Sequence, residues 1–331
     1  MKIERTEIEG YEEVVTCEDP ESGLRSIIAI HDRTLGPALG GLRMWPYGSW
    51  DDAKFDVLRL SKGMTYKSAV ADTGLGGGKS VIIGNPKTEK TEALFRAMGK
   101  FVDSLGGRYI TAEDVGTAVS DMVFVREETK YVTGLPLDMG SSGDPSPYTA
   151  LGTFVGIRAC LGEYFGSEDF EGRTVALQGC GHVGMFLADY LHEVGAKLFV
   201  ADISPDKAKA IADKTGAEIV DPNEIMFLDV DVFAPCALGA IVNDETLDKF
   251  HCKIIAGGAN NVLLREEHGQ RLKETGILYA PDYVINAGGI INVSIEVEGA
   301  YDAERSRKKV ENIYHAMKRV FEIAKDQNIP T

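Results

Sequence analysis

The chain has 331 residues, and 51 acidic against 35 basic side chains give it a formal net charge of -16. This acidic balance excludes nucleic acid and anionic membrane surfaces as expected partners. The five cysteines lack CxxC or histidine-rich spacing, so we expect reduced thiols and no metal site. The N-terminus lacks an apolar signal region and no apolar run approaches a membrane span, which predicts a cytoplasmic protein.

The first part of the chain is expected to combine strands with helices. Strands are predicted within residues 11–45, first at 11–17 and then at 24–31, and apolar residues at helical spacing cover 51–64. Further strands are expected at 80–83 and 108–111, with an amphipathic helix between them at 91–105. Turn residues are densest at 140–147, which predicts a crossover between domains.

From residue 149 onward, short apolar runs alternate with helical segments. Strands are expected at 174–178, 197–202, 218–220, 230–234, 254–256 and 278–280, and helices at 149–165, 183–194, 205–214 and roughly 303–325. This alternation predicts a parallel, doubly wound sheet. The predicted fold class is therefore α/β with two domains and a cleft between them: 1–135 for substrate binding, catalysis and oligomer contacts, and 136–331 as a Rossmann-type dinucleotide-binding domain.

A dinucleotide fingerprint follows the predicted strand 174–178. It has the form GxGxxG and consists of Gly179, Cys180, Gly181, His182, Val183 and Gly184, with a helix predicted directly after it. An acidic residue, Asp202, lies eighteen positions after Gly184, where it is expected to bind both adenosine ribose hydroxyls and repel a 2′-phosphate. The pattern predicts NAD as the cofactor; the alternative is a glycine-rich turn that binds nothing.

Two lysines and a carboxylate stand among small residues in the first domain. Lys67 and Lys79 are twelve residues apart, Lys79 follows the triple glycine 76–78, and Asp114 lies downstream. Two nearby cations destabilise each other's charge, so one lysine can have a lowered pKa while the other holds an anion. This combination suits an enzyme that grips a carboxylate while a second amine handles protons.

Other interpretations of these residues remain open at this point. The segment 73–80 nearly matches the phosphate loop GxxxxGK[ST], but Thr73 replaces its first glycine and the fingerprint at Gly179 would stay unexplained. Lys67 and Lys79 are also compatible with ordinary surface lysines. Asp114 is compatible with a helix cap before Val115.

Several further segments occur in a familiar order: HDRTLGPALGGLRM at 31–44, GMTYK at 63–67, GGGK at 76–79, RYITAEDVG at 108–116, APCALG at 234–239 and YAPDYVINAGGIINV at 279–293. Together they closely resemble the glutamate/leucine/phenylalanine/valine dehydrogenase family, most of all its leucine dehydrogenase branch. The resemblance implies reversible oxidative deamination of L-amino acids to 2-oxo acids and ammonium with a nicotinamide cofactor, in a homo-oligomer. Relatives continue past the position of Thr331 with a terminal helix.

The resemblance also implies roles for single residues. Lys67 would bind the substrate α-carboxylate, Lys79 would activate water for attack on the imino intermediate, and Asp114 would exchange protons with the amine. The backbone of Gly40 and Gly41 would position substrate. The remaining roles are Asn260 for substrate and cofactor, Thr149 for the nicotinamide amide, and Ala237 for cofactor.

Side-chain specificity is readable only through the resemblance, at Leu39, Ala112, Ile290 and Val293. Glutamate-specific relatives carry lysine and serine at the positions of Leu39 and Val293, and an unpaired carboxylate among apolar groups would be costly. Phenylalanine-specific relatives tend to have glycine in place of Ala112. The pocket therefore predicts leucine, valine or isoleucine, whose ranking stays open; the alternatives are an aromatic (phenylalanine or tryptophan) dehydrogenase and a non-catalytic NAD-binding regulator.

Overall fold

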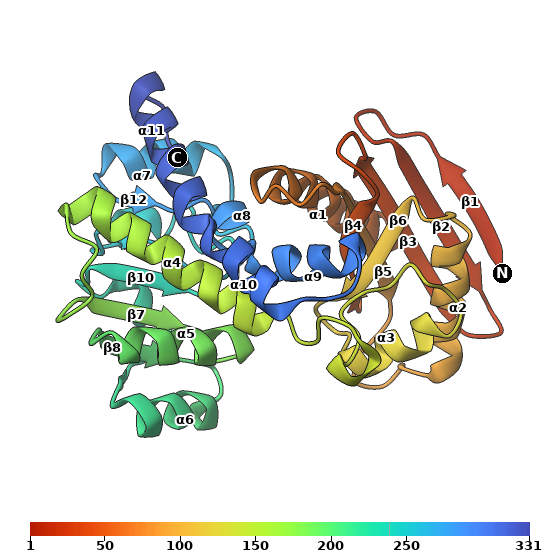
Figure 1. The fold of residues 1–331 in the computed structure, drawn as a ribbon, viewed down its shortest axis with the longest axis horizontal. Helices are drawn as coiled ribbons and strands as arrows, with labels where there is room; N and C mark the ends of the chain where they lie inside the picture. Colours follow the sequence, from red (N-terminus) through yellow and green to blue (C-terminus); the bar gives the residue numbers. More distant parts are fainter. Residues whose placement is uncertain (238) are drawn as a thin grey trace. The chain divides into compact units, whose positions relative to one another are not determined.

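The computed structural model describes every residue except Leu238. The chain forms two compact units, unit 1 with Met1–Pro145 and Ile290–Ala303, and unit 2 with Ser146–Gly289 and Glu304–Thr331 (Figure 1). A single boundary at residue 135 therefore differs from the observed division, because 136–145 belongs to unit 1 and the chain returns to that unit at Ile290. The change of unit at residue 145 lies within the turn-rich segment 140–147.

Unit 1 is built on a six-stranded sheet in the order β1-β2-β3-β5-β4-β6. The strands are β1 (Lys2–Thr6), β2 (Glu13–Asp19), β3 (Leu24–Asp32), β4 (Ala38–Trp45), β5 (Gly76–Ile83) and β6 (Tyr109–Glu113). Strand β4 runs parallel to both β5 and β6, whereas β1, β2, β3 and β5 pair antiparallel in turn. Strand β4 lies between β5 and β6, so the middle of β5 and the end of β6 come close to each other across β4, where the candidate active site lies.

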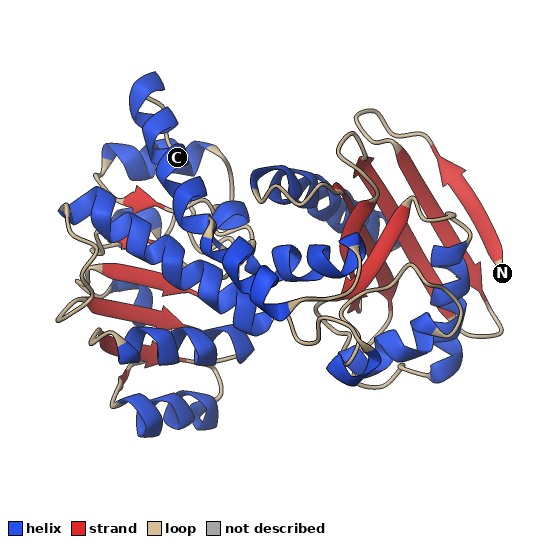
Figure 2. Cartoon of the chain, viewed as in Figure 1, coloured by secondary structure: helices blue, strands red, loops and turns tan. Residues whose placement is uncertain are grey.

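Helices cover the two faces of this sheet (Figure 2). Helix α1 (Trp50–Val70) packs Ala53 and Val57 against Val14 and Ile27 on one face. Helices α2 (Glu92–Asp103) and α3 (Val119–Arg126) pack on the other face, against the neighbouring strand residues Val15 and Ile28. Adjacent strand residues point to opposite faces, so apolar residues at successive positions of β2 and β3 are buried on both sides.

Two elements of unit 1 are longer than the sequence pattern predicts, and both changes matter for the site. Helix α1 ends at Val70, so Lys67 lies in its last turn, not beyond a helix ending at residue 64. Strand β5 begins at Gly76, so the triple glycine lies inside a fully buried strand. Glycine is a poor strand former, but hydrogen bonding to β3 and β4 on both sides overrides that propensity. The pattern also missed β1 and α3.

Unit 2 is built on a parallel sheet in the order β12-β11-β10-β7-β8-β9. Its strands are β7 (Thr174–Gln178), β8 (Lys197–Ala201), β9 (Glu218–Ile219), β10 (Val232–Pro235), β11 (Ile254–Ile255) and β12 (Leu278–Tyr279). Its helices are α4 (Ser146–Phe165), α5 (His182–Glu193), α6 (Pro205–Thr215), α7 (Glu267–Glu274), α8 (Asp282–Ile285), α10 (Ala303–Glu311) and α11 (Ile313–Gln327). The α/β, Rossmann-like prediction is confirmed, and β7 and β10 flank the point where the strand order reverses.

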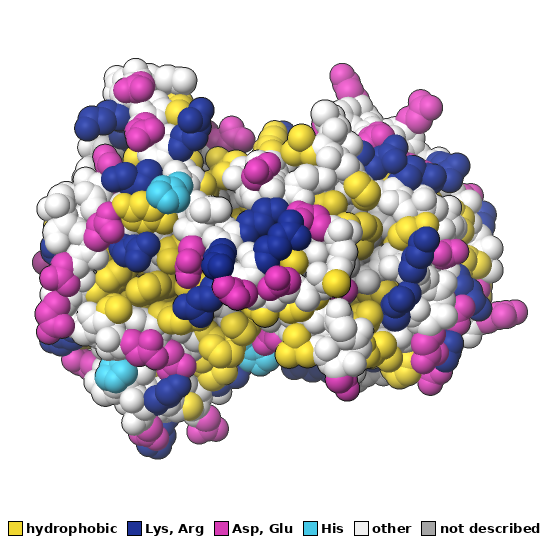
Figure 3. All heavy atoms as spheres, in the orientation of Figure 1, with side chains coloured by type: hydrophobic (Ala, Val, Ile, Leu, Met, Phe, Trp, Pro, Cys, Tyr) yellow, Lys and Arg dark blue, Asp and Glu magenta, His cyan; other side chains and the backbone are white. Residues whose placement is uncertain are grey.

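The C-terminal part differs from the prediction at several helices, of which α7 and α8 were not predicted. The expected helix at roughly 303–325 is divided into α10 and α11 at Asn312. Before it, α9 (Gly288–Glu298) forms a helix that the pattern did not predict, and most of it belongs to unit 1. Acidic and basic side chains are interspersed on the face drawn in Figure 3. None of the helices in the described chain is long and apolar enough to cross a membrane.

Candidate active site

A buried ion pair between Lys79 and Asp114 forms the centre of the site in unit 1. The Lys79 Nζ lies 3.0 Å from Asp114 Oδ2, and Lys79 is only 5% exposed. Lys79 belongs to β5 and Asp114 follows the last residue of β6, so both come from strands that flank β4. Asp114 lies in a turn closed by Thr117, and α3 begins only at Val119; the helix-cap interpretation of Asp114 is therefore wrong.

Glycines allow the strands to approach one another around this pair. A Cβ on Gly41 would lie 2.7 Å from the Asp114 Cβ and 3.3 Å from the Lys79 Nζ. A Cβ on Gly40 would lie 1.7 Å from the carbonyl oxygen of Gly78. Any side chain at these two positions would occupy the space of the ion pair or of the neighbouring strand.

The triple glycine has a structural explanation of the same kind. A Cβ on Gly77 would lie 2.1 Å from the backbone nitrogen of Thr65 in α1, and one on Gly78 would lie 2.8 Å from the ring of Tyr109. The Tyr109 hydroxyl donates a 2.5 Å hydrogen bond to the carbonyl oxygen of Gly40. Since these glycines belong to a strand and not to a loop before a helix, the phosphate-loop interpretation of 73–80 is excluded.

The protonation of Lys79 is set by its surroundings. Burial lowers the pKa of Lys79, the Asp114 carboxylate raises it, Arg43 lowers it further, and the net direction is downward. The lowered pKa of Lys79 agrees with the expectation that one of the two lysines has a lowered pKa, and burial and the charge of Arg43 are what lower it. Burial raises the pKa of Asp114, but the cations Lys79 and Arg43 outweigh it, so the net shift is downward.

Lys67 lies in the last turn of α1 and is half-buried. Helix α1 packs against β5 through Thr65, two residues before Lys67, at the position of Gly77. Contact with this strand places the end of α1 that carries Lys67 beside the strand that carries Lys79. A cation in a last turn is also favourable to the helix dipole.

The four residues expected to line the substrate side-chain pocket are all buried and all belong to unit 1. Leu39 lies on β4, Ala112 on β6, and Ile290 and Val293 on α9. Within the sheet, Ala112 is directly opposite Gly41. The return of α9 to unit 1 therefore brings residues that are far apart in the sequence into the same compact unit.

Sequence reasoning missed the residue that anchors α9. Glu296 accepts hydrogen bonds from the Ser141 hydroxyl at 2.6 Å, from the Ser142 backbone at 3.1 Å and from the Gly134 backbone at 3.2 Å. Val293 and Glu296 are three residues apart on one helix, so both lie on the same side of α9. A carboxylate within a mostly apolar helix was the available signal.

In unit 2, the fingerprint forms the turn between β7 and α5. Gly179 has a φ of 99°, in the region that favours glycine, and a Cβ there would lie 2.8 Å from that of Ala237. Gly181 is the N-cap of α5, and a Cβ on it would meet no atom within 4 Å. A Cβ on Gly184 would lie 2.0 Å from the carbonyl oxygen of Gly179. The turn is thus packed by its first and third glycines and open at its second, as pyrophosphate binding requires.

Asp202 follows β8 beside this turn. Its Oδ2 accepts a 2.7 Å hydrogen bond from the Cys180 backbone, and its Oδ1 accepts one of 2.8 Å from the Ser204 backbone. Carboxylate oxygens have several lone pairs, so these bonds orient Asp202 and leave acceptor capacity for ribose hydroxyls. Unit 2 also holds the predicted Thr149, in α4, and Asn260, whose Oδ1 accepts from Asn286 Nδ2 at 2.9 Å.

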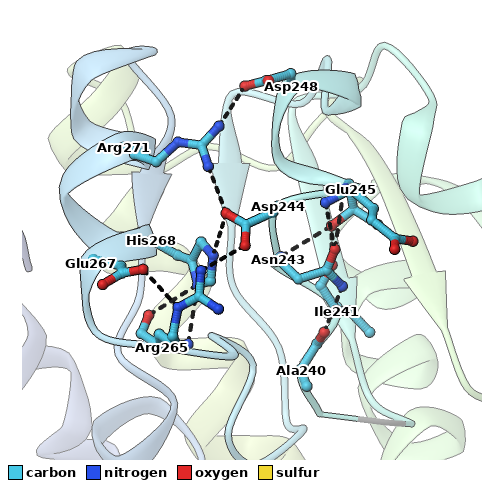
Figure 4. Close-up of polar contacts among 11 residues, drawn as sticks. Ala240, Ile241, Asn243, Asp244, Glu245, Asp248, Arg265, Glu267, His268 and Arg271 are labelled. Atoms are coloured by element: carbon cyan, nitrogen blue, oxygen red, sulfur yellow. Dashed lines mark hydrogen bonds and ion pairs between the residues drawn. The ribbon is translucent and has the colours of Figure 1, made fainter.

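The loop after β10 is anchored by an ionic cluster (Figure 4). Asp244 pairs with Arg265 at 2.6 Å and with Arg271 of α7 at 3.0 Å. The fully buried His268 lies 3.3 Å from Asp244, and its Nδ1 accepts from the Arg265 backbone. The cluster holds one end of the loop that begins with Cys236 and Ala237; Leu238, part of the segment APCALG, lies outside the described residues.

No group of three or more histidine, cysteine or carboxylate side chains among the described residues is arranged to hold a metal ion. The described cysteines are free thiols, and four of the five are buried.

Comparison with known proteins places this geometry in a family. Residues 11–131 match the model described as the Glu/Leu/Phe/Val dehydrogenase dimerisation domain, and residues 200–330 match the Glutamate/Leucine/Phenylalanine/Valine dehydrogenase model. Leucine dehydrogenase of Thermoactinomyces intermedius is 56% identical over 97% of this chain and 87% of its own length. Phenylalanine dehydrogenase of Bacillus thermotolerans is 49% identical over 97% of this chain and 85% of its own length.

A solved structure agrees with these sequence matches. The crystal structure of L-tryptophan dehydrogenase from Nostoc punctiforme superposes with a TM-score of 0.82 and 49% identity, covering 97% of this chain and 92% of that one. The chain therefore belongs to the Glu/Leu/Phe/Val dehydrogenase family of amino-acid dehydrogenases.

Proposed function

We propose that this chain catalyses the reversible, NAD-dependent oxidative deamination of branched-chain L-amino acids, with L-leucine first and valine and isoleucine as further substrates. The products are a 2-oxo acid, ammonium and NADH. The observation that carries the proposal is the Lys79–Asp114 pair, in which a buried amine of lowered pKa on the glycine-rich strand β5 lies beside a carboxylate. Leucine dehydrogenases at 53–56% identity over 97% of the chain support the choice of substrate.

The protein groups have separate tasks in this mechanism. Lys67 binds the substrate α-carboxylate, and Asp114 takes a proton from the substrate ammonium group so that the nitrogen lone pair becomes available. When bound, the nicotinamide supplies the acceptor for the hydride that leaves the substrate α-carbon. Lys79, in its neutral form, then removes a proton from the water that attacks the resulting iminium carbon.

Collapse of the tetrahedral adduct completes the reaction. The proton that Asp114 took is returned to the leaving nitrogen, and the remaining hydroxyl proton of the adduct passes to the departing ammonia as the carbonyl forms, which gives ammonium. The proton that Lys79 took from water is then released to solvent. Atoms balance as amino acid, oxidised cofactor and water giving 2-oxo acid, ammonium, reduced cofactor and a proton. The lowered pKa of Lys79 supports this role, because a base must be deprotonated near the working pH.

The residues of unit 2 suit NAD. The open space over Gly181 leaves room for a pyrophosphate at the first turn of α5, and the close packing at Gly179 and Gly184 keeps that turn in shape. Asp202 beside the turn favours ribose hydroxyls and repels a 2′-phosphate, so we propose NAD in preference to NADP. Ala237, Thr149 and Asn260 are proposed to contact the cofactor, and Asn260 the substrate as well.

Apolar side chains set the substrate class. Leu39, Ala112, Ile290 and Val293 are proposed to enclose the aliphatic side chain, which excludes glutamate because its carboxylate would be buried without a partner. An aromatic amino-acid dehydrogenase is the second candidate, favoured by phenylalanine and tryptophan dehydrogenases at 49% and 50% identity. Ala112 argues against that candidate, since its methyl group takes space that an aromatic ring needs.

The test is absorbance of reduced nicotinamide with NAD or NADP and single L-amino acids at alkaline pH. We expect strong NADH formation with leucine, valine or isoleucine, and little with glutamate, phenylalanine or tryptophan. Turnover of aromatic amino acids alone would select the second candidate. Binding of NADH without turnover of any amino acid would contradict the catalytic roles of Lys79 and Asp114.

We further propose that the chain works as a cytoplasmic homo-oligomer. Support comes from the match of residues 11–131 to a domain described as a dimerisation domain. Light scattering after size exclusion tests the assembly, and a monomer at micromolar concentration would contradict it.

A further inference from the structure

Arg43 lies at the centre of unit 1's active-site electrostatics, although the mechanism above gives it no task. It belongs to β4, two residues after Gly41, and its side chain is 20% exposed. Its Nε donates to Asp114 Oδ2 at 3.1 Å, and its Nη1 donates to Asp56 Oδ2 at 2.9 Å. The guanidinium therefore connects the proposed proton acceptor to helix α1.

The far end of this connection is fixed by a further hydrogen bond. The Tyr47 hydroxyl donates to the same Asp56 oxygen at 2.6 Å. Asp56 thus accepts from two side chains at once, and Arg43 is held at both of its ends. A planar guanidinium held in this way has less freedom than a lysine ammonium would have at the same place.

The bonds distinguish the two oxygens of Asp114. Oδ2 accepts from both Arg43 and Lys79, at 3.1 and 3.0 Å. Among the residues that the structure describes, no group donates to Oδ1. One oxygen is therefore occupied by protein cations, and the other is available for a ligand.

We propose that Arg43 is a positioning residue for the deamination reaction: held by Asp56 and Tyr47, it fixes the Asp114 carboxylate so that Oδ2 faces Lys79 and Oδ1 faces the substrate amine. This inference rests on the proposed function of the same site. The charge of Arg43 also disfavours the protonated form of Lys79, which gives the proposal an electrostatic readout. A purely structural ion pair between β4 and α1 would not have that readout.

The test compares Arg43→Gln and Arg43→Lys with the parent enzyme in pH profiles of kcat and kcat/KM for leucine oxidation. For Arg43→Gln we expect kcat to fall about a hundredfold, because a misplaced proton acceptor loses alignment. We also expect the limb where activity rises with pH to move to higher pH, because the Lys79 pKa rises. Arg43→Lys restores the charge without the fork geometry, so the limb returns toward its original position while kcat stays lowered.

Matched variants separate positioning from stability. Arg108 pairs with Glu13 at 2.9 Å and is comparably half-buried, but it lies at the opposite end of β6 from Asp114. Arg108→Gln is expected to lower the melting temperature and leave the pH profile unchanged. Tyr47→Phe keeps all charges and frees one bond of Asp56, so a smaller loss of kcat without movement of the limb is expected.

A second readout does not need turnover. The Lys79 amine is titrated by NMR in lysine-labelled protein, with Lys79→Met to assign its signal, in the parent and in Arg43→Gln. A higher Lys79 pKa in the variant supports the inference even where no amino acid is oxidised. Failure of the proposed function, which shows as absent turnover, can therefore be told apart from failure of this inference. Unchanged kcat, pH profile and Lys79 pKa in folded Arg43→Gln would overturn the inference, and if that variant does not fold, the same comparison is made with Arg43→Lys and Tyr47→Phe.

Discussion

The proposed active site of unit 1, around Lys79 and Asp114, and the proposed nucleotide-binding turn of unit 2, at Gly179–Gly184, are built in different ways. The turn is local: its six consecutive residues follow β7 and include the first residues of α5, and Asp202 directly follows the next strand. The proposed active site of unit 1 combines β4, β5, β6 and α1, and its central ion pair joins residues 79 and 114. A local site can be recognised from spacing alone, whereas a site assembled from several elements depends on how the sheet is paired.

The two sites also use glycine for different purposes. At the turn, Gly181 leaves open space where a ligand can approach. At the proposed active site of unit 1, Gly41 and Gly78 leave no open space, because protein atoms fill the positions that side chains would occupy. Glycine in unit 2 therefore leaves room for the proposed ligand, and glycine in unit 1 leaves room for other parts of the protein. Substitutions at these positions test that distinction.

The largest expected effect is that of Lys79→Ala on turnover. General acid–base groups contribute roughly 10²–10⁴-fold, so we expect kcat for leucine to fall by about that factor. Because the Lys79 pKa is lowered, the parent limb where kcat rises with pH should lie below the usual lysine pKa of about 10.4, and the variant should lose this limb. The measurement is stopped-flow or steady-state kinetics between neutral and alkaline pH. NADH affinity serves as the control and is expected to be unchanged; full turnover by the variant would exclude the proposed mechanism.

Gly41→Ala should destabilise unit 1. The new methyl group would lie 2.7 Å from both the Asp114 Cβ and the Glu113 carbonyl oxygen, so the free energy of unfolding should fall by about 1–3 kcal/mol. Urea unfolding measures this change. The matched control is Gly63→Ala in α1, where no atom lies within 4 Å; it should stabilise by about 0.5–1 kcal/mol. Equal stability of the two variants would contradict the close packing at Gly41.

Gly181→Ala should affect binding and not folding. Its backbone φ is not in the left-handed region and its Cβ position is free, so the melting temperature should stay that of the parent. The methyl group would occupy space proposed for the pyrophosphate, and we expect the NADH Kd to rise about tenfold, equivalent to ~1.4 kcal/mol. Fluorescence titration with NADH checks this, with Gly63→Ala again as the control. Unchanged affinity would argue against pyrophosphate at this turn.

The smallest expected effect on function is that of Glu296→Gln. The amide preserves the size of the side chain but weakens the charge-assisted bonds to Ser141, Ser142 and Gly134, so we expect a loss of about 1–2 kcal/mol. Looser anchoring of Ile290 and Val293 should raise the kcat/KM ratio of phenylalanine to leucine several-fold. Asp213→Asn, which breaks an exposed pair with Lys209, is the control and should change stability by less than about 0.5 kcal/mol. An unchanged substrate ratio would separate Glu296 from specificity.

Much of unit 2 was predictable from the sequence, since alternating apolar runs and helical segments are local signals. Strand β7 was predicted with its observed bounds, and the change of unit falls within the predicted crossover at 140–147. Family membership was likewise readable from the order of the motifs. In unit 1, residue types indicated Lys67, Lys79 and Asp114 because a triple glycine beside a lysine is unusual, but their arrangement was not visible.

Tertiary structure decided the rest, because it depends on contacts between distant segments. Burial within the sheet placed Gly76–Gly78 in a strand despite their weak strand propensity, and burial together with Arg43 lowered the Lys79 pKa. The return of α9 brought Ile290 and Val293 into unit 1 and defined the anchoring role of Glu296. The sequence by itself determined which chemical groups are present and which local turns they form; the pairing order of the strands determined which groups meet, because non-local contacts have no period along the chain.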